Sequence, residues 1–340
     1  MHRVTLLPGD GIGPEITAAT IVVLEAAGVE LQWERFEAVG LAGMERYGRP
    51  LPEAVLDSIR MNRVALKGPI TTPVGKGFRS VNVSLRQKLD LFANVRPCRK
   101  LPGLRTPFED VDLVIFRENT EGLYSGIETY DERLEIADST ARITRRGSQR
   151  ILRFAFEWAR VNGRRHVTAV HKANVVKMST GLFLKEAIAM ASAYPDLDFD
   201  HRIVDNMAMQ LVQRPAEYDC IVTTNLFGDI LSDLCAGLVG GLGVVPGANI
   251  GDSVAVFEAV HGSAPDIAGQ GTANPTALIR TAAMMLRHLG ERTAAETIEA
   301  ALRQAYVEGC WLTPDVGGSS TTMDFAHRLA ERVASKQGEA

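Results

Sequence analysis

VTLLPGDGIGPEITAATIVVLEAAG, residues 4–28, joins a short apolar run to a segment of helical periodicity through a glycine-rich turn. The apolar run VTLL is typical of a buried strand, and the helix that follows is entered through Pro14 and closed by Gly28. Further strands are expected along the chain, most of them followed by a helical pattern, at residues 31–36, 64–68, 112–116, 166–170, 199–204 and 220–224. This alternation predicts an α/β fold with a largely parallel central sheet.

The turn GDGIGPE (9–15) has part of the glycine fingerprint of dinucleotide-binding folds. That fingerprint needs a third glycine at position 14, where this chain has Pro14. A glycine turn that leads into a proline-started helix accounts for the motif. The sequence therefore does not predict a classical Rossmann fold.

The composition limits the classes of protein to which the chain can belong. It has 340 residues, 46% of them hydrophobic and 23% charged, with a formal net charge of -4. This supports a large core in two domains or one large α/β unit, and it excludes a general nucleic-acid or membrane-surface footprint. The four cysteines form no CxxC pair, the first residues lack an apolar run of signal-peptide length, and no stretch approaches the ~20 apolar residues of a membrane span. We expect a cytoplasmic protein without nucleic-acid or membrane partners.

GDILSD (228–233) places Asp229 and Asp233 four residues apart, so a helix would carry both carboxylates on one face. Such a pair suits Mg²⁺ or Mn²⁺, which prefer oxygen ligands and keep room for water and substrate. The motif is equally consistent with the start of a helix, where the helix dipole favours acidic residues. Asp205, expected at the end of the strand 199–204, is a candidate third carboxylate.

Two further motifs place chemically active side chains at expected strand ends. Lys172 in HKAN follows one strand, and Tyr124 lies in RENTEGLY, which begins with Arg117 at the end of another. Ligands of α/β sheets commonly bind in the crevice at the carboxyl ends of the strands. Taken singly, each residue type is more often found on the surface than in catalysis. Together, the lysine and the tyrosine are a candidate base and acid.

Three further segments stand out in the sequence. RSVNVSLRQKLDLFANVRPCR (79–99) gathers four arginines in an acidic chain, which indicates either a solvated helix face or a site for a ligand with several negative charges. Residues 122–146 alternate without helical periodicity and suggest a two-stranded arm. HGSAPDIAGQGTANP (261–275) is a long loop of small residues, where a ligand can approach the backbone.

These motifs, with TTPVGKG before the arginine segment and NLFGDILSDLCAGLVGGLG around the acidic pair, resemble the β-decarboxylating dehydrogenases over nearly the whole chain. That family comprises isocitrate, homoisocitrate, 3-isopropylmalate and tartrate dehydrogenases, and the chain is most similar to its NAD-dependent isocitrate dehydrogenases. The resemblance implies the two-domain isocitrate/isopropylmalate dehydrogenase-like fold. Residues 1–94 and 243–340 would form the large domain, and residues 95–242 the small domain. An arm at 124–146 would clasp a second subunit, giving a homodimer or a higher oligomer.

The resemblance also implies which residues bind substrate: Ser80, Asn82, Arg86, Arg96 and Arg117. The guanidinium groups would bind the substrate carboxylates through strong charge-assisted hydrogen bonds. Ser80 and Asn82 would contact the γ-carboxylate of isocitrate, although Ser80 is also well placed as a helix N-cap. Arg79 and Arg99 match no substrate position.

By the same resemblance, Asp205, Asp229 and Asp233 would hold Mg²⁺ or Mn²⁺, and Tyr124, Lys172 and Asp205 would be catalytic. Lys172, directly or through water or Asp205, would take the proton of the substrate hydroxyl while hydride passes to the nicotinamide. Tyr124 would protonate the substrate carbon after CO₂ leaves. Lys172 and Asp205 would come from the partner subunit.

The resemblance implies eight residues for the NAD site: Thr72, Asn174, His261, Gly262, Ala264, Asp266, Ile267 and Asn274. Asp266 can accept hydrogen bonds from the adenosine ribose, whereas it would repel the 2′-phosphate of NADP by about 4 kcal/mol at ~4 Å and an effective dielectric of ~20. NADP-using relatives have lysine and tyrosine at the positions of Asp266 and Ile267. We therefore expect NAD as the cofactor.

The predicted reaction is the oxidative decarboxylation of isocitrate to 2-oxoglutarate and CO₂ with reduction of NAD. Homoisocitrate, 3-isopropylmalate and tartrate are alternative substrates, but the Ser80-x-Asn82 pattern resembles isocitrate dehydrogenases. A regulatory subunit that binds ligand without turnover is a further alternative. Such a subunit would be expected to lack part of the catalytic and metal set, which is complete in this chain.

Overall fold

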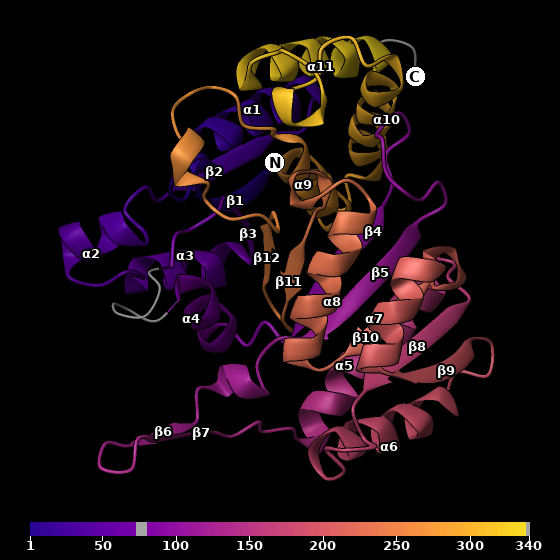
Figure 1. Cartoon of the computed structure of the whole chain (residues 1–340). Helices are drawn as coiled ribbons and strands as arrows, with labels where there is room; N and C mark the ends of the chain where they lie inside the picture. Colours follow the sequence, from indigo (N-terminus) through magenta and orange to yellow (C-terminus); the bar gives the residue numbers. More distant parts are fainter. Residues whose placement is uncertain (73–79, 338–340) are drawn as a thin grey trace.

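The computed structural model describes residues 1–72 and 80–337, and a ten-stranded sheet covered by helices on both faces forms its centre (Figure 1). The strands lie in the order β2 (Leu31–Arg35), β1 (His2–Leu7), β3 (Val64–Lys67), β12 (Ala255–Glu258), β11 (Ala248–Ile250), β4 (Ala93–Arg99), β5 (Asp112–Glu118), β10 (Cys220–Thr223), β8 (His166–His171) and β9 (Asp198–Ile203). The helices are α1 (Gly13–Ala26), α2 (Leu41–Tyr47), α3 (Glu53–Asn62), α4 (Val81–Lys88), α5 (Arg145–Val161), α6 (Ser179–Ala191), α7 (Val204–Gln213), α8 (Asn225–Leu238), α9 (Thr276–His288), α10 (Arg292–Glu308) and α11 (Thr322–Gln337). In these described residues, no helix is both long and apolar enough to cross a membrane.

The sheet consists of two parallel halves that run in opposite directions. β2, β1, β3 and β12 are parallel at one end, and β5, β10, β8 and β9 are parallel at the other. β11 and β4 connect the halves, because β12–β11, β11–β4 and β4–β5 are all antiparallel pairs. The predicted α/β fold with a largely parallel sheet is confirmed, and its antiparallel centre was not predicted.

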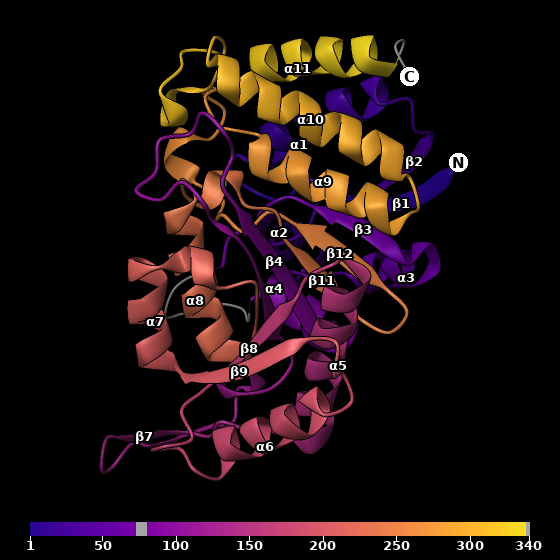
Figure 2. The same ribbon diagram turned by 90° about the vertical axis from the view of Figure 1, so that its right-hand side faces the viewer.

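Side chains alternate along the strands between two apolar layers, as the pleat requires. In β5, Leu113 and Ile115 pack into a core with α1 and with the stacked helices α9, α10 and α11 (Figure 2). Val114 and Phe116 point to the opposite face, where they pack against α5. This two-sided burial explains why the parallel strands appear in the sequence as short, continuous apolar runs.

The GDGIGPE motif forms a glycine turn that leads into α1, as predicted. Gly9 and Gly11 have φ values of 81° and 59°, and a Cβ atom on either residue would lie 2.0 Å from a backbone oxygen, that of Pro69 or of Ser263. The backbone nitrogens of Asp10 and Ile12 donate to these same two oxygens. The turn thereby holds together the loop after β3 and the loop that begins at residue 261, which both contribute to the site described below.

One local prediction was wrong, and the arginine segment is divided between two elements. Of that segment, α4 covers 81–88 and β4 covers 93–99, while Arg79 lies outside the described residues. Asp205 does not end a strand: β9 stops at Ile203, and Asp205 lies in the first turn of α7. The polar residues of β4 obscure its strand pattern, and Asp205 fits the helix start because acidic groups are favoured there.

The segment 124–146 contains the antiparallel ribbon β6 (Glu128–Asp131) and β7 (Ile136–Ser139), which projects from the body of the molecule (Figure 1). All eight of its residues are exposed. Its role as a dimerisation arm stays a prediction, as does the division into two domains, whose first boundary falls within β4.

Candidate active site

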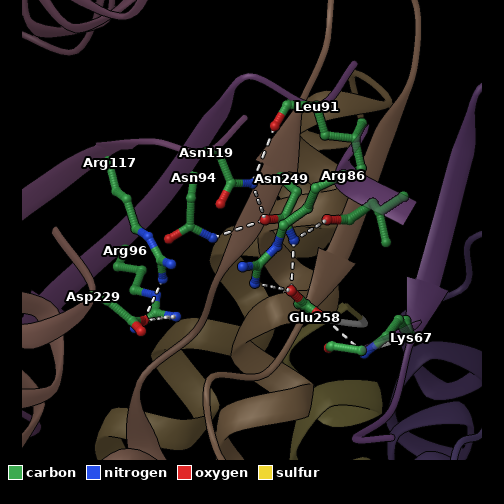
Figure 3. A network of polar contacts seen from close by, with 12 residues as sticks. Lys67, Arg86, Leu91, Asn94, Arg96, Arg117, Asn119, Asp229, Asn249 and Glu258 are labelled. Carbon is green, nitrogen blue, oxygen red and sulfur yellow. Dashed lines mark hydrogen bonds and ion pairs between the residues drawn. The ribbon is translucent and has the colours of Figure 1, made fainter. Parts of the chain in front are cut away.

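Two of the three predicted substrate-binding arginines line a cavity of about 210 Å³, and the third lies beside it. Arg86 comes from α4 and Arg96 from β4, both in the cavity wall, while Arg117 comes from β5 and is 1% exposed. Figure 3 shows Arg96 and Arg117 turned toward Asp229 and Arg86 turned toward Glu258. Three guanidinium groups from three elements are thus concentrated around one small space.

Asp229 of α8 is the acidic centre of this arginine cluster. Its carboxylate accepts from Arg117 Nη1, accepts from the Tyr124 hydroxyl at 2.5 Å and lies 3.8 Å from Arg96 Nη2. Burial alone would raise the pKa of Asp229, but Arg117, the Tyr124 hydroxyl and Arg96 outweigh it, so the pKa is lowered. The carboxylate is therefore ionised at neutral pH.

Burial shifts the pKa values of Arg117 and Tyr124, the two neighbours of Asp229, in opposite directions. Burial, together with the nearby Arg86, lowers the pKa of Arg117 to about 10, which still leaves it charged at neutral pH. Burial, followed by the hydrogen bond to Asp229, raises the pKa of Tyr124. Tyr124 is therefore a protonated donor beside the cavity.

Asp229 and Asp233 lie on one face of α8, as predicted, but neither is in its first turn. The alternative of a helix start is therefore wrong. Asp233 accepts from Arg96 Nη1 at 3.0 Å, and its side chain is 57% exposed. Within residues 1–72 and 80–337 there is no group of three or more His, Cys, Asp or Glu side chains that could hold a metal ion, so one chain offers this pair without a third carboxylate.

Lys172 and Asp205 form a pair of their own outside the arginine cluster. Lys172 follows β8, and its Nζ donates to Asp205 Oδ1 at 2.8 Å. This hydrogen bond lowers the pKa of Asp205, whose side chain is 69% exposed. Neither residue lines the cavity. The structure therefore brings the two predicted partner-derived residues together, apart from Asp229 and Asp233.

The remaining predicted substrate residues lie at the start of α4. Asn82 lines the cavity, whereas Ser80 does not. Ser80 occupies the N-cap position of α4 but makes no side-chain capping bond, and its hydroxyl accepts from Thr72 at 3.1 Å. Ser80 therefore lies at the N-cap position, but its hydroxyl does not cap the helix.

A second cavity of about 370 Å³ adjoins the first, since His261 and Gly262 line both. Its wall includes five of the eight predicted cofactor residues: His261, Gly262, Ala264, Ile267 and Asn274. Thr72, Asn174 and Asp266 are exposed and are not in the wall. Burial lowers the pKa of His261, so this ring is neutral at pH 7.

Several residues of the two cavities were not predicted from the sequence: Lys67, Asn94, Glu258 and Asp315. Lys67 and Glu258 end neighbouring strands in register and are joined at 2.6 Å. Asp315 accepts from Asn274 Nδ2 at 3.0 Å. The signal available in the sequence was a charged residue directly after a short apolar run, in VALK and in AVFE.

The comparisons with known proteins agree over the length of the chain. The family model described as isocitrate/isopropylmalate dehydrogenase matches residues 3–329. The chain is 50% identical over 330 residues to isocitrate dehydrogenase [NAD] catalytic subunit 5, mitochondrial, of Arabidopsis thaliana, covering 97% of this chain and 88% of that protein. It is 48% identical over 336 residues to human isocitrate dehydrogenase [NAD] subunit alpha, mitochondrial, covering 98% and 91%.

The fold is similarly shared. A crystal structure of isocitrate dehydrogenase from Methylococcus capsulatus matches with a TM-score of 0.95 and 55% sequence identity, covering 98% of this chain and 100% of that chain. The likeness therefore extends to the whole arrangement of sheet and helices and is not limited to the motifs.

Proposed function

Because the chain belongs to the isocitrate/isopropylmalate dehydrogenase family, we propose that it catalyses the NAD-dependent oxidative decarboxylation of isocitrate to 2-oxoglutarate and CO₂. The observation that carries this function is the cluster of Arg86, Arg96 and Arg117 at a cavity next to Tyr124 and Asp229. Isocitrate has three carboxylates, and three guanidinium groups can hold and neutralise them.

The residues divide the chemical work as follows. The arginines orient the carboxylates, which fixes the hydroxyl-bearing carbon relative to the cofactor. Lys172, directly or through water or Asp205, takes the proton of the hydroxyl, and its Nζ is hydrogen-bonded to Asp205. After CO₂ has left, the Tyr124 hydroxyl donates a proton to the substrate carbon from which the CO₂ was lost.

NAD fits the second cavity by its position and its lining. That cavity adjoins the arginine cluster through His261 and Gly262, so a nicotinamide can reach the substrate while the adenosine lies near Asn274 and Ile267. Asp266 lies on the same loop with an exposed side chain. We propose that this carboxylate selects NAD by repelling a 2′-phosphate.

A divalent cation fits the donor set of Asp229 and Asp233, two carboxylates on one helix face with the Asp233 side chain more than half exposed. Asp205 from a second subunit would complete the set. Bound there, Mg²⁺ or Mn²⁺ would make the substrate hydroxyl more acidic and stabilise negative charge on its oxygen. EDTA should abolish activity and Mg²⁺ or Mn²⁺ should restore it, whereas full activity after chelation would exclude this site.

We further propose a homodimer whose subunits share their sites. The separation of the Lys172–Asp205 pair from the arginine cluster supports it. So do exposed apolar side chains near that pair and on α7 and α8: Val175, Met178, Met209, Val212 and Ile230. The names of the human and Arabidopsis relatives contain the word subunit, so a mixed assembly is the alternative. Light scattering on the purified chain distinguishes a self-assembled dimer from a monomer that needs another chain.

The location in the cell is also a proposal. The human and Arabidopsis relatives are mitochondrial by name. The sequence predicts a cytoplasmic location, and fractionation of cells that produce the protein decides between the two.

The experiment that tests the function is an NAD-reduction assay with isocitrate, homoisocitrate, 3-isopropylmalate, malate and tartrate in parallel, with release of CO₂ measured. We expect the highest kcat/KM with isocitrate. A higher kcat/KM with homoisocitrate or 3-isopropylmalate would assign the chain to that alternative. Binding of isocitrate without turnover by the purified protein would instead indicate a regulatory subunit.

A further inference from the structure

Three buried asparagines form a chain of amide hydrogen bonds beside the first cavity (Figure 3). Asn94 of β4, Asn119 directly after β5 and Asn249 of β11 are 1%, 3% and 2% exposed. Asn94 and Asn249 are cross-strand partners, and Asn94 also lines the cavity. Polar side chains buried to this degree in a sheet need a bonding partner for each donor.

Asn249 is the centre of this chain, and its partners fix the orientation of its amide. Its Oδ1 accepts from Asn94 Nδ2 and from Asn119 Nδ2, both at 2.9 Å. Its Nδ2 donates to Glu258 Oε1 at 2.7 Å. The reversed amide would direct NH₂ at two NH₂ groups and a carbonyl oxygen at a carboxylate, so only one orientation satisfies the neighbours.

One oxygen of Glu258 accepts hydrogen bonds from both Asn249 and the substrate-site Arg86. Glu258 Oε1 also accepts from Arg86 Nη2 at 3.1 Å, while Glu258 Oε2 accepts from Lys67 Nζ at 2.6 Å. Burial alone would raise the pKa of Glu258, but Lys67 and Arg86 outweigh it and keep the pKa far below its usual range. The carboxylate of Glu258 thus stays charged, and its orientation determines the position of the Arg86 guanidinium group that is bound to it.

We propose that Asn249 is a positioning residue for substrate binding: it orients Glu258, which in turn fixes Arg86 and Lys67 at the wall of the cavity. The proposal rests on the proposed function, because it assigns Arg86 to a substrate carboxylate. An amide suits this position because it gives Glu258 a third donor without a third positive charge. A lysine or arginine here would instead add charge to a wall that already contains Lys67, Arg86 and Arg96.

The test uses Asn249→Asp, which keeps an acceptor for Asn94 and Asn119 but places a second carboxylate against Glu258. With one proton shared by the two carboxyl groups, an O–H replaces the lost N–H and Glu258 stays in place. Without that proton the carboxylates repel and Arg86 loses its support. The charged groups in contact with Glu258 are Lys67 from β3 and Arg86 from α4, and both favour loss of the proton. The defect should therefore grow as the pH rises.

The expected result is a KM for isocitrate raised roughly ten-fold over the unmodified protein at pH 8, which corresponds to about 1.4 kcal/mol, because Arg86 loses part of its charge-assisted hydrogen bonding. The ratio of the two KM values should shrink as the pH is lowered toward 6, with kcat changed less than KM. A ratio that is independent of pH, or an unchanged KM with only a lower Tm, would overturn the proposal.

Two further variants separate this result from simple misfolding. The leucine side chain of Asn249→Leu does not titrate, so this variant should raise the KM for isocitrate by a factor that does not depend on pH. An unchanged KM would also overturn the proposal. Asn62→Asp is the matched control, because Asn62 donates to the carboxylate of Glu34 at 2.9 Å and neither residue lines either cavity. It should lower stability without moving the KM. Isocitrate oxidation by the unmodified protein tests the proposed function independently.

Discussion

The Tyr124 hydroxyl is the group whose loss should most directly affect the last chemical step. Tyr124→Phe removes the proton donor but leaves the ring under Arg117, whose guanidinium carbon lies 5.0 Å from the ring centroid. We expect kcat to fall by ~10² to 10⁴-fold, with early NADH formation preserved. Rapid-mixing absorbance separates the two steps, and Tyr47→Phe on exposed α2 is the control. A kcat within about two-fold of the unmodified protein is incompatible with an acid role.

Asp266 and Ile267 test cofactor choice. Because Asp266 should repel a 2′-phosphate, the unmodified protein should prefer NAD strongly over NADP. The double change Asp266→Lys with Ile267→Tyr should lower kcat/KM for NAD and raise it for NADP. Asp110→Lys, which makes the same charge change at another exposed position, should leave the ratio unchanged. Equal kcat/KM values for both cofactors before any substitution would remove the basis for this assignment.

Among the elements, α8 must pack closely on β5 because it brings Asp229 to Arg117. A Cβ at Gly228 would lie 2.6 Å from Cβ and Cγ of Arg117, whereas one at Gly237 of the same helix would meet no atom within 4 Å. Gly228→Ala should therefore reduce stability by about 1–3 kcal/mol and raise the KM for isocitrate. Gly237→Ala should stabilise by about 0.5–1 kcal/mol through helix propensity. Denaturant unfolding measures the stabilities, and steady-state kinetics measure the KM. A stability of Gly228→Ala equal to that of the unmodified protein would show that α8 has room to shift.

The same elements show what the sequence can reveal. β1, β3, β5, β8 and β10 were predicted because each is a buried apolar run, most of them followed by a helical pattern. β4 was not, since Asn94, Arg96 and Pro97 interrupt its apolar pattern, and β11 has only three residues. The antiparallel centre depends on pairing between residues far apart in sequence, which no local pattern contains.

The candidate site divides along the same line. Arg86, Arg96 and Asp229 were expected together and lie together, because whole motifs identified them. Lys67 and Glu258 are separated by 191 positions, and only the sheet order makes them neighbours. The asparagine chain of β4 and β11 was missed for the same reason.

For the whole molecule, the decisive question is whether one chain contains a complete site. Lys172→Met should stop isocitrate oxidation, since methionine cannot accept the hydroxyl proton, and Tyr124→Phe should nearly stop turnover. If Lys172 serves the partner's site, a mixed dimer contains one site with both residues intact and one with neither. Co-refolding the two variants should then restore about a quarter of the unmodified activity, because random mixing makes about half of the dimers mixed and each has one good site of two.

A second pair of variants sharpens this experiment, because Lys172 and Asp205 lie 2.8 Å apart on the same chain and would be contributed together. In mixed dimers of Lys172→Met and Asp205→Asn, every site receives one altered residue of that pair, so no activity should return. Recovery with Tyr124→Phe and none with Asp205→Asn is the pattern that only a shared site produces. If neither combination recovers while mass-tagged subunits prove that mixed dimers form, all of these residues act within one subunit. The Lys172–Asp205 pair would then need a movement within the chain to reach Asp229, and the homodimer would have no part in catalysis.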